Sequence, residues 1–175
     1  MSETVPQMFE ILLVEDQVRH QKVYEAAITE SLPARVQFAT SGEAALQALA
    51  AERPPDLVIL DLEIPGIGGA GVLQKIRADF RLRYIPVIIL TGASGSDKQL
   101  ELLDLGADDF IEKGCAPPVL IARLKAQLRH KLSIDRLERL AIDRDLFAAG
   151  VLQDIGSSKW TIVSLCRTAK DSLSR

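Results

Sequence analysis

Five short segments with a strand-like pattern recur along the first two thirds of the chain, and segments with helical spacing of apolar residues separate them. Most of the strand-like segments are continuous apolar runs that end at a polar residue, which is typical of strands buried on both faces. The predicted strands are residues 10–14, 35–39, 56–60, 86–90 and 109–112, and the predicted helices are residues 18–31, 42–51, 70–79, 96–105 and 116 to about 147. This alternation predicts an α/β fold, a doubly wound, five-stranded parallel sheet with helices on both faces.

Prolines, glycines and a serine mark the ends of the predicted helices. Pro33 stops the first helix, because proline cannot continue one, and Ser41 is placed to cap the second. We expect residues 1–8 to be a flexible N-terminus, residues 9–129 to form the α/β domain, and residues 130–175 to form a helical extension.

The composition agrees with this fold and argues against some functions. Apolar residues make up 47% of the 175 residues and aromatic residues only 5%, so we expect an aliphatic core. The net charge of −3 and the lack of a long basic run argue against a nucleic-acid partner. The apolar runs are too short to span a membrane. Since no secretory signal is visible, we expect Cys115 and Cys166 to be reduced thiols in the cytoplasm.

Polar side chains follow four of the predicted strands, at the point where each strand ends. They are Glu15, Asp16, Asp61, Thr91 and Lys113. The carboxyl ends of the strands in a doubly wound sheet share one edge, where ligands bind, so these side chains are expected to converge. Three carboxylates together need a cation, and Mg²⁺ prefers oxygen ligands. A hydroxyl and a lysine beside them favour phosphoryl transfer, with Asp61 as the nucleophile.

Four motifs at these strand ends resemble those of a known family, the receiver domains of bacterial two-component response regulators. The motifs are residues 11–16 (ILLVED), 57–69 (LVILDLEIPGIGG), 86–92 (PVIILTG) and 106–113 (GADDFIEK). The resemblance covers roughly residues 9–129 and implies a flavodoxin-like fold.

The resemblance also implies a role for each matching residue. It implies that Asp61 is the phosphoacceptor and that Thr91 and Lys113 contact the phosphoryl group. The implied Mg²⁺ ligands are Glu15, Asp16, Asp61 and the backbone carbonyl of Glu63. Phe110 matches the aromatic residue that switches position, although a plain core role is the alternative.

Some residues near the expected site depart from the family pattern or have an ordinary explanation. Gly114 follows Lys113 where the family usually has a proline with a cis bond, so the loop there is expected to differ. Glu63 adds a negative charge near the site. We expect His20 and His130 to be exposed helix residues with no catalytic part, and Cys115 to be an inert small residue.

The last predicted helix is longer than a receiver needs. Its second part and the residues beyond it carry apolar residues in steps of three and four, with Arg144 as the one gap. They are Ile134, Leu137, Ala141, Ala148, Val151 and Ile155. Such a seam predicts a coiled coil and, most simply, a parallel homodimer. The alternative is that the helix folds back on its own receiver.

Residues 147–162 (FAAGVLQDIGSSKWTI) show a second, shorter resemblance, to the helix of sensor kinases that carries the phosphoacceptor histidine. Gln153 stands at the histidine position, and an amide cannot accept a phosphoryl group. The chain also ends before any ATP-binding domain, so we expect the phosphoryl group to come from elsewhere.

The sequence therefore predicts a phosphorylation-dependent signalling module that is not an enzyme beyond its own phosphorylation and dephosphorylation. Its expected partner is a sensor histidine kinase or a phosphotransfer protein. One alternative is a constitutive dimerisation or adaptor module that has kept the fold and lost signalling. Another is the N-terminal fragment of a degenerate receiver–kinase hybrid. A phosphatase-like hydrolase is disfavoured, because residues 61–63 read D-L-E where such enzymes have D-x-D.

Overall fold

The computed structural model describes residues 8–92 and 104–148, except for the side chains of residues 137–139 and 141–148. The chain divides into two units, Met1–Ser133 and Ile134–Arg175. The boundary expected from the sequence, after Arg129, lies four residues earlier.

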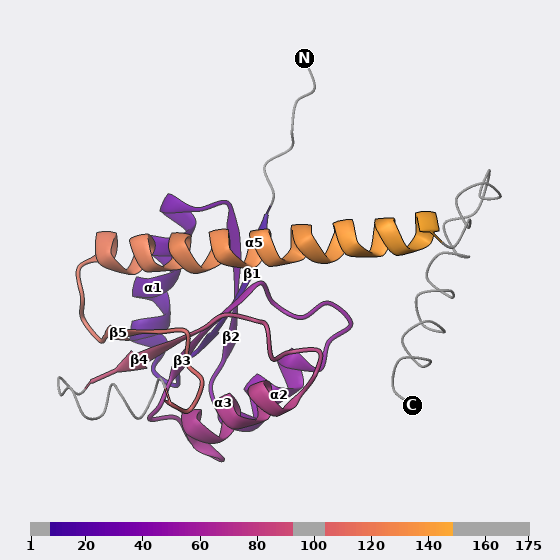
Figure 1. Cartoon of the computed structure of the whole chain (residues 1–175). Coiled ribbons are helices and arrows are strands. Elements are labelled where there is room, and N and C mark those ends of the chain that lie inside the picture. Colours follow the sequence, from indigo (N-terminus) through magenta and orange to yellow (C-terminus); the bar gives the residue numbers. More distant parts are fainter. Residues whose placement is uncertain (1–7, 93–103, 149–175) are drawn as a thin grey trace. The chain divides into compact units, whose positions relative to one another are not determined.

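The first unit is built on a parallel sheet of five strands in the order β2-β1-β3-β4-β5 (Figure 1). The strands are β1 (Phe9–Val14), β2 (Ala34–Ala39), β3 (Leu57–Asp61), β4 (Val87–Thr91) and β5 (Asp109–Glu112). The chain passes from β1 outward to β2 and then returns past β1 to β3, so the strand order reverses between β1 and β3. This confirms the doubly wound, flavodoxin-like fold expected from the sequence.

Helices cover both faces of the sheet (Figure 1). They are α1 (Val18–Ser31), α2 (Gly42–Leu49), α3 (Gly68–Ala78) and α5 (Pro117–Ala148). Side chains of α2 and α3 pack in one hydrophobic cluster, and those of α1 and the first part of α5 pack in another. The helix expected at residues 96–105 lies outside the described residues, apart from its last two positions.

The central strands divide their side chains between these two clusters. In β3, Val58 and Leu60 point into the α2–α3 cluster, whereas Leu57 and Ile59 point into the α1–α5 cluster. All five residues of β3 and all five of β4 are buried. Because both faces are covered, the strands read as continuous apolar runs rather than as alternating patterns.

Two of the expected helix ends are confirmed, and one helix starts earlier than expected. Helix α1 ends at Ser31, before Pro33, and the Ser41 hydroxyl accepts a hydrogen bond from the backbone N–H of Ala44 at 3.2 Å. Helix α3 begins at Gly68, whereas the sequence predicted residue 70. A Cβ on Gly69 would lie 2.2 Å from the carbonyl oxygen of Asp61, so the glycine allows this first turn to pack on the strand end.

Helix α5 runs without a break from Pro117 to Ala148, within one residue of its predicted bounds. In its second part, Ile134 is half-buried and Leu140 is 56% exposed. Most of the apolar seam and the whole stretch around Gln153 lie outside the described side chains. No helix in the described part of the chain is long and apolar enough to cross a membrane.

Candidate functional site

The polar residues predicted to converge come from four strand ends at one edge of the sheet. Glu15 and Asp16 follow β1, Asp61 ends β3, Thr91 ends β4, and Lys113 follows β5. Since β1, β3, β4 and β5 are consecutive parallel neighbours, their carboxyl ends lie side by side. The site therefore lies beside the reversal of strand order, where ligands bind in folds of this kind.

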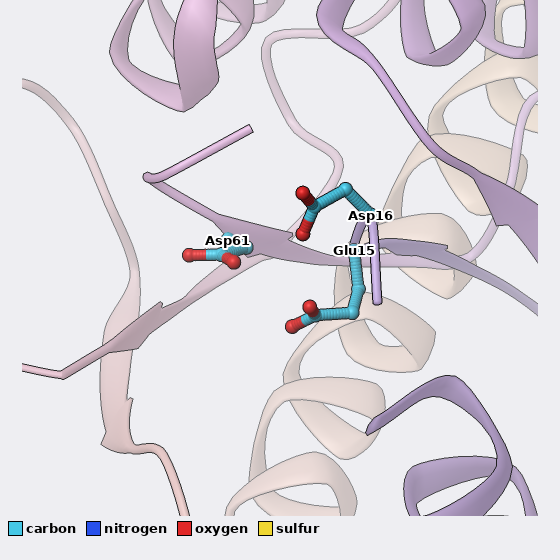
Figure 2. A group of neighbouring side chains, drawn as sticks. All are labelled: Glu15, Asp16 and Asp61. Carbon is cyan, nitrogen blue, oxygen red and sulfur yellow. The ribbon is translucent and has the colours of Figure 1, made fainter. Parts of the chain in front are cut away.

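Three carboxylates form the centre of the site (Figure 2). One ligand oxygen from each of Glu15, Asp16 and Asp61 lies within 4.8 Å of the other two. The side chains of Glu15 and Asp61 are buried, at 0% and 1% exposed, whereas Asp16 is exposed. Two buried negative charges this close repel each other strongly, so the arrangement requires positive charge nearby.

Lys113 supplies the positive charge from within the chain. Its Nζ donates a hydrogen bond to Oδ2 of Asp61 at 2.5 Å and lies 4.0 Å from Oε2 of Glu15. Burial by itself would lower the pKa of Lys113, but the hydrogen bond to Asp61 and the charges of Asp61, Glu15 and Glu63 outweigh it and raise the pKa above its ordinary value. Lys113 is therefore a fixed cation at neutral pH.

A backbone N–H binds the second oxygen of the Asp61 carboxylate. Its Oδ1 accepts a hydrogen bond from the backbone N–H of Glu63 at 3.0 Å. One oxygen thus faces the loop that leads into α3, and the other faces Lys113. This fixes the orientation of the carboxylate at the end of β3.

Glu15 is buried, and only one of its two carboxylate oxygens is hydrogen-bonded within the described residues. Its Oε1 accepts the backbone N–H of Gln17 at 3.1 Å, but Oε2 is buried and has no hydrogen-bond partner within residues 8–92 and 104–148. Burial, the largest cause, together with the charge of Asp61 raises the pKa of Glu15 above its ordinary value, although the Gln17 hydrogen bond and Lys113 oppose this. A buried oxygen without a partner, in a cluster of three carboxylates, fits a hard divalent cation such as Mg²⁺.

Thr91 and Phe110 lie where the sequence analysis placed them. Thr91 is the buried last residue of β4, and its backbone carbonyl accepts the N–H of Lys113 at 2.8 Å. Phe110, in β5, is half-buried against the α2–α3 cluster, with the guanidinium of Arg123 6.0 Å from the centre of its ring. The structure thus places both residues on strands that frame the site.

His20 lies in a helix, as expected, but it is not fully exposed. The residue is half-buried in the first turn of α1, and its Nδ1 lies 3.2 Å from Oε1 of Glu15. The sequence carries only a partial signal for this contact. A helix that begins at Val18, two residues after Asp16, brings its first turn near the end of β1, but the apolar pattern does not specify which side chain faces Glu15.

Gly114 shows how the loop after Lys113 departs from the family pattern. Its φ is +83°, in the left-handed region, and no peptide bond in the described residues is cis. Proline fixes φ near −65°, so a proline could not adopt this conformation. The loop between β5 and α5 therefore has its own backbone path, as the sequence predicted.

The comparisons with known proteins agree with the fold. The residue pattern that defines the response regulator receiver domain matches residues 11–125. Response regulator PleD of Caulobacter vibrioides is 36% identical over 129 residues, which cover 74% of this chain and 28% of that protein. Transcriptional regulatory protein KdpE of Mycobacterium tuberculosis is 39% identical over 113 residues, which cover 65% of this chain and 48% of that protein. The chain thus spans less than half the length of either relative.

Solved structures of similar fold include two receiver domains. One is the receiver domain of a putative LuxO repressor protein from Vibrio parahaemolyticus, with a TM-score of 0.69 and 28% identity, covering 75% of this chain and 98% of that one. The other is the receiver domain of a signal transduction histidine kinase from Syntrophus aciditrophicus, with a TM-score of 0.64 and 33% identity, covering 70% and 91%. Because the family pattern matches more than half of the sequence and the fold agrees, the chain belongs to the response regulator receiver domain family.

Proposed function

We propose that this chain is a phosphorylation-dependent signalling module in which Asp61 accepts a phosphoryl group from a histidine kinase or a phosphotransfer protein. The observation that carries the proposal is the buried Asp61 carboxylate, which lies beside those of Glu15 and Asp16 and is paired with Lys113. Family membership supports the same role. The module resides in the cytoplasm and is not an enzyme beyond its own phosphorylation and dephosphorylation.

Mg²⁺ is the proposed cofactor. The residues that would hold it are Glu15, Asp16, Asp61 and the backbone carbonyl of Glu63, because the three carboxylates lie together and Glu15 has a buried oxygen without a partner. The cation would neutralise negative charge on the phosphoryl oxygens as transfer proceeds.

The protein's own residues account for the rest of the transfer. A carboxylate oxygen of Asp61 attacks the phosphorus of phosphohistidine, the P–N bond breaks, a P–O bond forms, and the electron pair of the broken bond leaves with the imidazole. Lys113, which pairs with Asp61 before transfer, is placed to pair with a phosphoryl oxygen afterwards. The hydroxyl of Thr91 donates a hydrogen bond to another.

The proposed output is a change in protein–protein contacts. Movement of Thr91 toward the phosphoryl group reorients Phe110 and biases a pre-existing equilibrium in the β4–β5–α5 part of the domain. The extension of α5 beyond Ser133 joins two copies of the chain through its apolar seam. Phosphorylation of Asp61 changes the packing of this dimer. Nucleic acid is not a proposed partner, since the net charge of the chain is −3.

Incubation with Mg²⁺ and acetyl phosphate or phosphoramidate, followed by intact-mass measurement, tests the proposal. The wild type is expected to gain the mass of one phosphoryl group, and Asp61→Asn is expected to gain none. Asp56→Asn is a matched control at the opposite end of β3, where the side chain accepts the N–H of Glu10, and it should behave as the wild type. If no donor phosphorylates the wild type, the signalling proposal fails and the adaptor alternative is favoured.

A further inference from the structure

His20 contacts the buried carboxylate of Glu15 and is not one of the three acids that form the centre of the site. Its Nδ1 lies 3.2 Å from Oε1 of Glu15, and its side chain is 38% exposed while that of Glu15 is 0% exposed. His20 does not belong to the set of residues whose ligand atoms all lie within 4.8 Å of one another. The imidazole therefore touches a member of the acidic cluster without being part of it.

The two oxygens of Glu15 have different surroundings. Oε1 has two partners, the backbone N–H of Gln17 at 3.1 Å and the His20 ring, whereas Oε2 has no hydrogen-bond partner among the described residues. The torsion that turns a glutamate carboxylate has broad preferences, so one hydrogen bond leaves the group free to rotate about that contact. A second contact from another direction fixes its plane.

We propose that His20 is a positioning residue for the cation: it holds Oε1 of Glu15, so that Oε2 is presented to the metal. Loss of a partner that orients a metal ligand from outside typically weakens metal binding by about 10–100-fold. The inference rests on the proposed function only in requiring that a divalent cation binds at Glu15, Asp16 and Asp61.

The first turns of α1 hold this stretch of chain at several points. Besides the contacts of Gln17 and His20 with the side chain, the buried Nε2 of Gln21 donates to the backbone carbonyl of Glu15 at 2.6 Å. The backbone of Glu15 therefore stays fixed when His20 is changed. Only the carboxylate of Glu15 loses a contact. An effect of the substitution on metal binding can therefore be distinguished from an effect on folding.

Two substitutions distinguish the hydrogen bond from the bulk of the ring. His20→Leu removes the donor and keeps a side chain of similar size. His20→Asn keeps a donor nitrogen close to the place of Nδ1. His130→Leu serves as the matched control, since His130 is exposed on α5.

Binding of Mg²⁺, and of Mn²⁺ followed by electron paramagnetic resonance, should be titrated with the full chain at pH 8, where free histidine is neutral. We expect His20→Leu to raise the Kd about tenfold. His20→Asn and the control should stay within about threefold of the wild type, and thermal unfolding in EDTA should be similar for all four proteins. The Mg²⁺ concentration that half-saturates Asp61 phosphorylation should rise by the same factor, and the rate at saturating Mg²⁺ should not fall.

Three results would overturn the inference. His20→Leu could bind as tightly as the wild type or more tightly, as simple removal of a nearby base would predict. Both His20 variants could weaken binding equally, which would assign the effect to the ring itself. If the wild type binds neither cation, the metal-dependent function fails together with this inference, whereas a wild type that binds and is phosphorylated leaves only His20 in question.

Discussion

The carboxylate of Glu15 is buried beside Asp61, and no group in the described part of the chain forms a hydrogen bond with its Oε2. Its pKa is raised, chiefly by burial, so the folded protein holds this proton more tightly than the unfolded chain does. The protonated form therefore stabilises the fold fully below the ordinary pKa, and this contribution is lost as the pH rises through the raised value. At pH 8 without a cation, the ionised carboxylate of Glu15 destabilises the folded protein.

Glu15→Gln should accordingly stabilise the metal-free protein at pH 8, by about 1 kcal/mol in the free energy of unfolding. The advantage should shrink toward pH 4, where the wild type is protonated. Urea unfolding in EDTA across this pH range measures both effects. In saturating Mg²⁺ the order should reverse, because a ligand at 100 times its Kd adds about 2.7 kcal/mol to a protein that binds it.

Glu30→Gln is the matched control for this experiment, because Glu30 is exposed on the last turn of α1. Its stability should follow that of the wild type with and without Mg²⁺. A Glu15→Gln protein that is less stable than the wild type in EDTA at pH 8 would show that the carboxylate is satisfied, contrary to its surroundings here.

Lys113 is the opposite case, a cation whose removal leaves two buried acids facing each other. Its raised pKa means that its stabilising contribution is fully present at neutral pH and is lost only as the pH rises through that value. Lys113→Met should destabilise the metal-free protein by about 2 kcal/mol, less than for a fully buried pair, since the lysine side chain is 18% exposed.

Denaturant unfolding of Lys113→Met beside Lys75→Met checks this expectation. Lys75 is exposed on α3, so its substitution should change stability by less than about 0.5 kcal/mol. Added Mg²⁺ should restore part of the loss at Lys113. Equal effects of the two substitutions would mean that the ion pair with Asp61 contributes nothing to folding.

The sequence was enough to predict the acids, the hydroxyl and the lysine of the site, because parallel strands bring their carboxyl ends to one edge whatever the details of packing. It was not enough for His20. Its contact depends on the rotational phase of α1 relative to the end of β1, which a pattern of apolar positions fixes only coarsely. The N–H of Glu63 that holds Asp61 also depends on the local path of a loop.

At the scale of elements, the start of α3 controls how the helix meets the end of β3. The sequence suggested a longer loop here, since glycines at positions 68 and 69 are poor helix formers. In the structure Gly69 donates its N–H to the carbonyl of Leu62 at 3.1 Å, and a Cβ on Gly69 would lie 2.7 Å from Cα of Leu62. The start of α3 therefore depends on the close approach of two backbone segments, which the apolar pattern of the sequence does not reveal.

Gly69→Ala should therefore force the turn after Asp61 to move. We expect a loss of about 2 kcal/mol in the free energy of unfolding, typical of overpacking, and slower phosphorylation of Asp61 by acetyl phosphate. Gly92→Ala is the control, because a Cβ there meets no atom of the described residues within 4 Å and its φ lies outside the left-handed region. A Gly69→Ala protein as stable and as reactive as Gly92→Ala would refute this account of the turn.

At the scale of the whole molecule, α5 belongs to two units. Its first part is buried against the sheet through Leu120, Ile121, Leu124 and Leu128, and the chain divides after Ser133, within the same helix. The bounds of this helix were predictable because the segment has no Gly or Pro after Pro118. The seam beyond Ser133 has an apolar pattern of its own, and this is why we assign it a second copy of the chain.

Residues 1–133 should therefore fold and be phosphorylated without the rest of the chain. We expect their unfolding temperature to lie within about 3 °C of that of the receiver in the full chain, since no described side chain beyond Leu128 belongs to the core clusters. Size-exclusion chromatography with light scattering should show a dimer for residues 1–175 and a monomer for residues 1–133.

In the full chain, Ile134→Glu should weaken the dimer, because it places a charge in the seam. Ser133→Glu, at an exposed neighbouring position, should not. A dimer that persists in residues 1–133 would place the interface on the receiver itself, and phosphorylation would then have to act through the faces of the sheet domain.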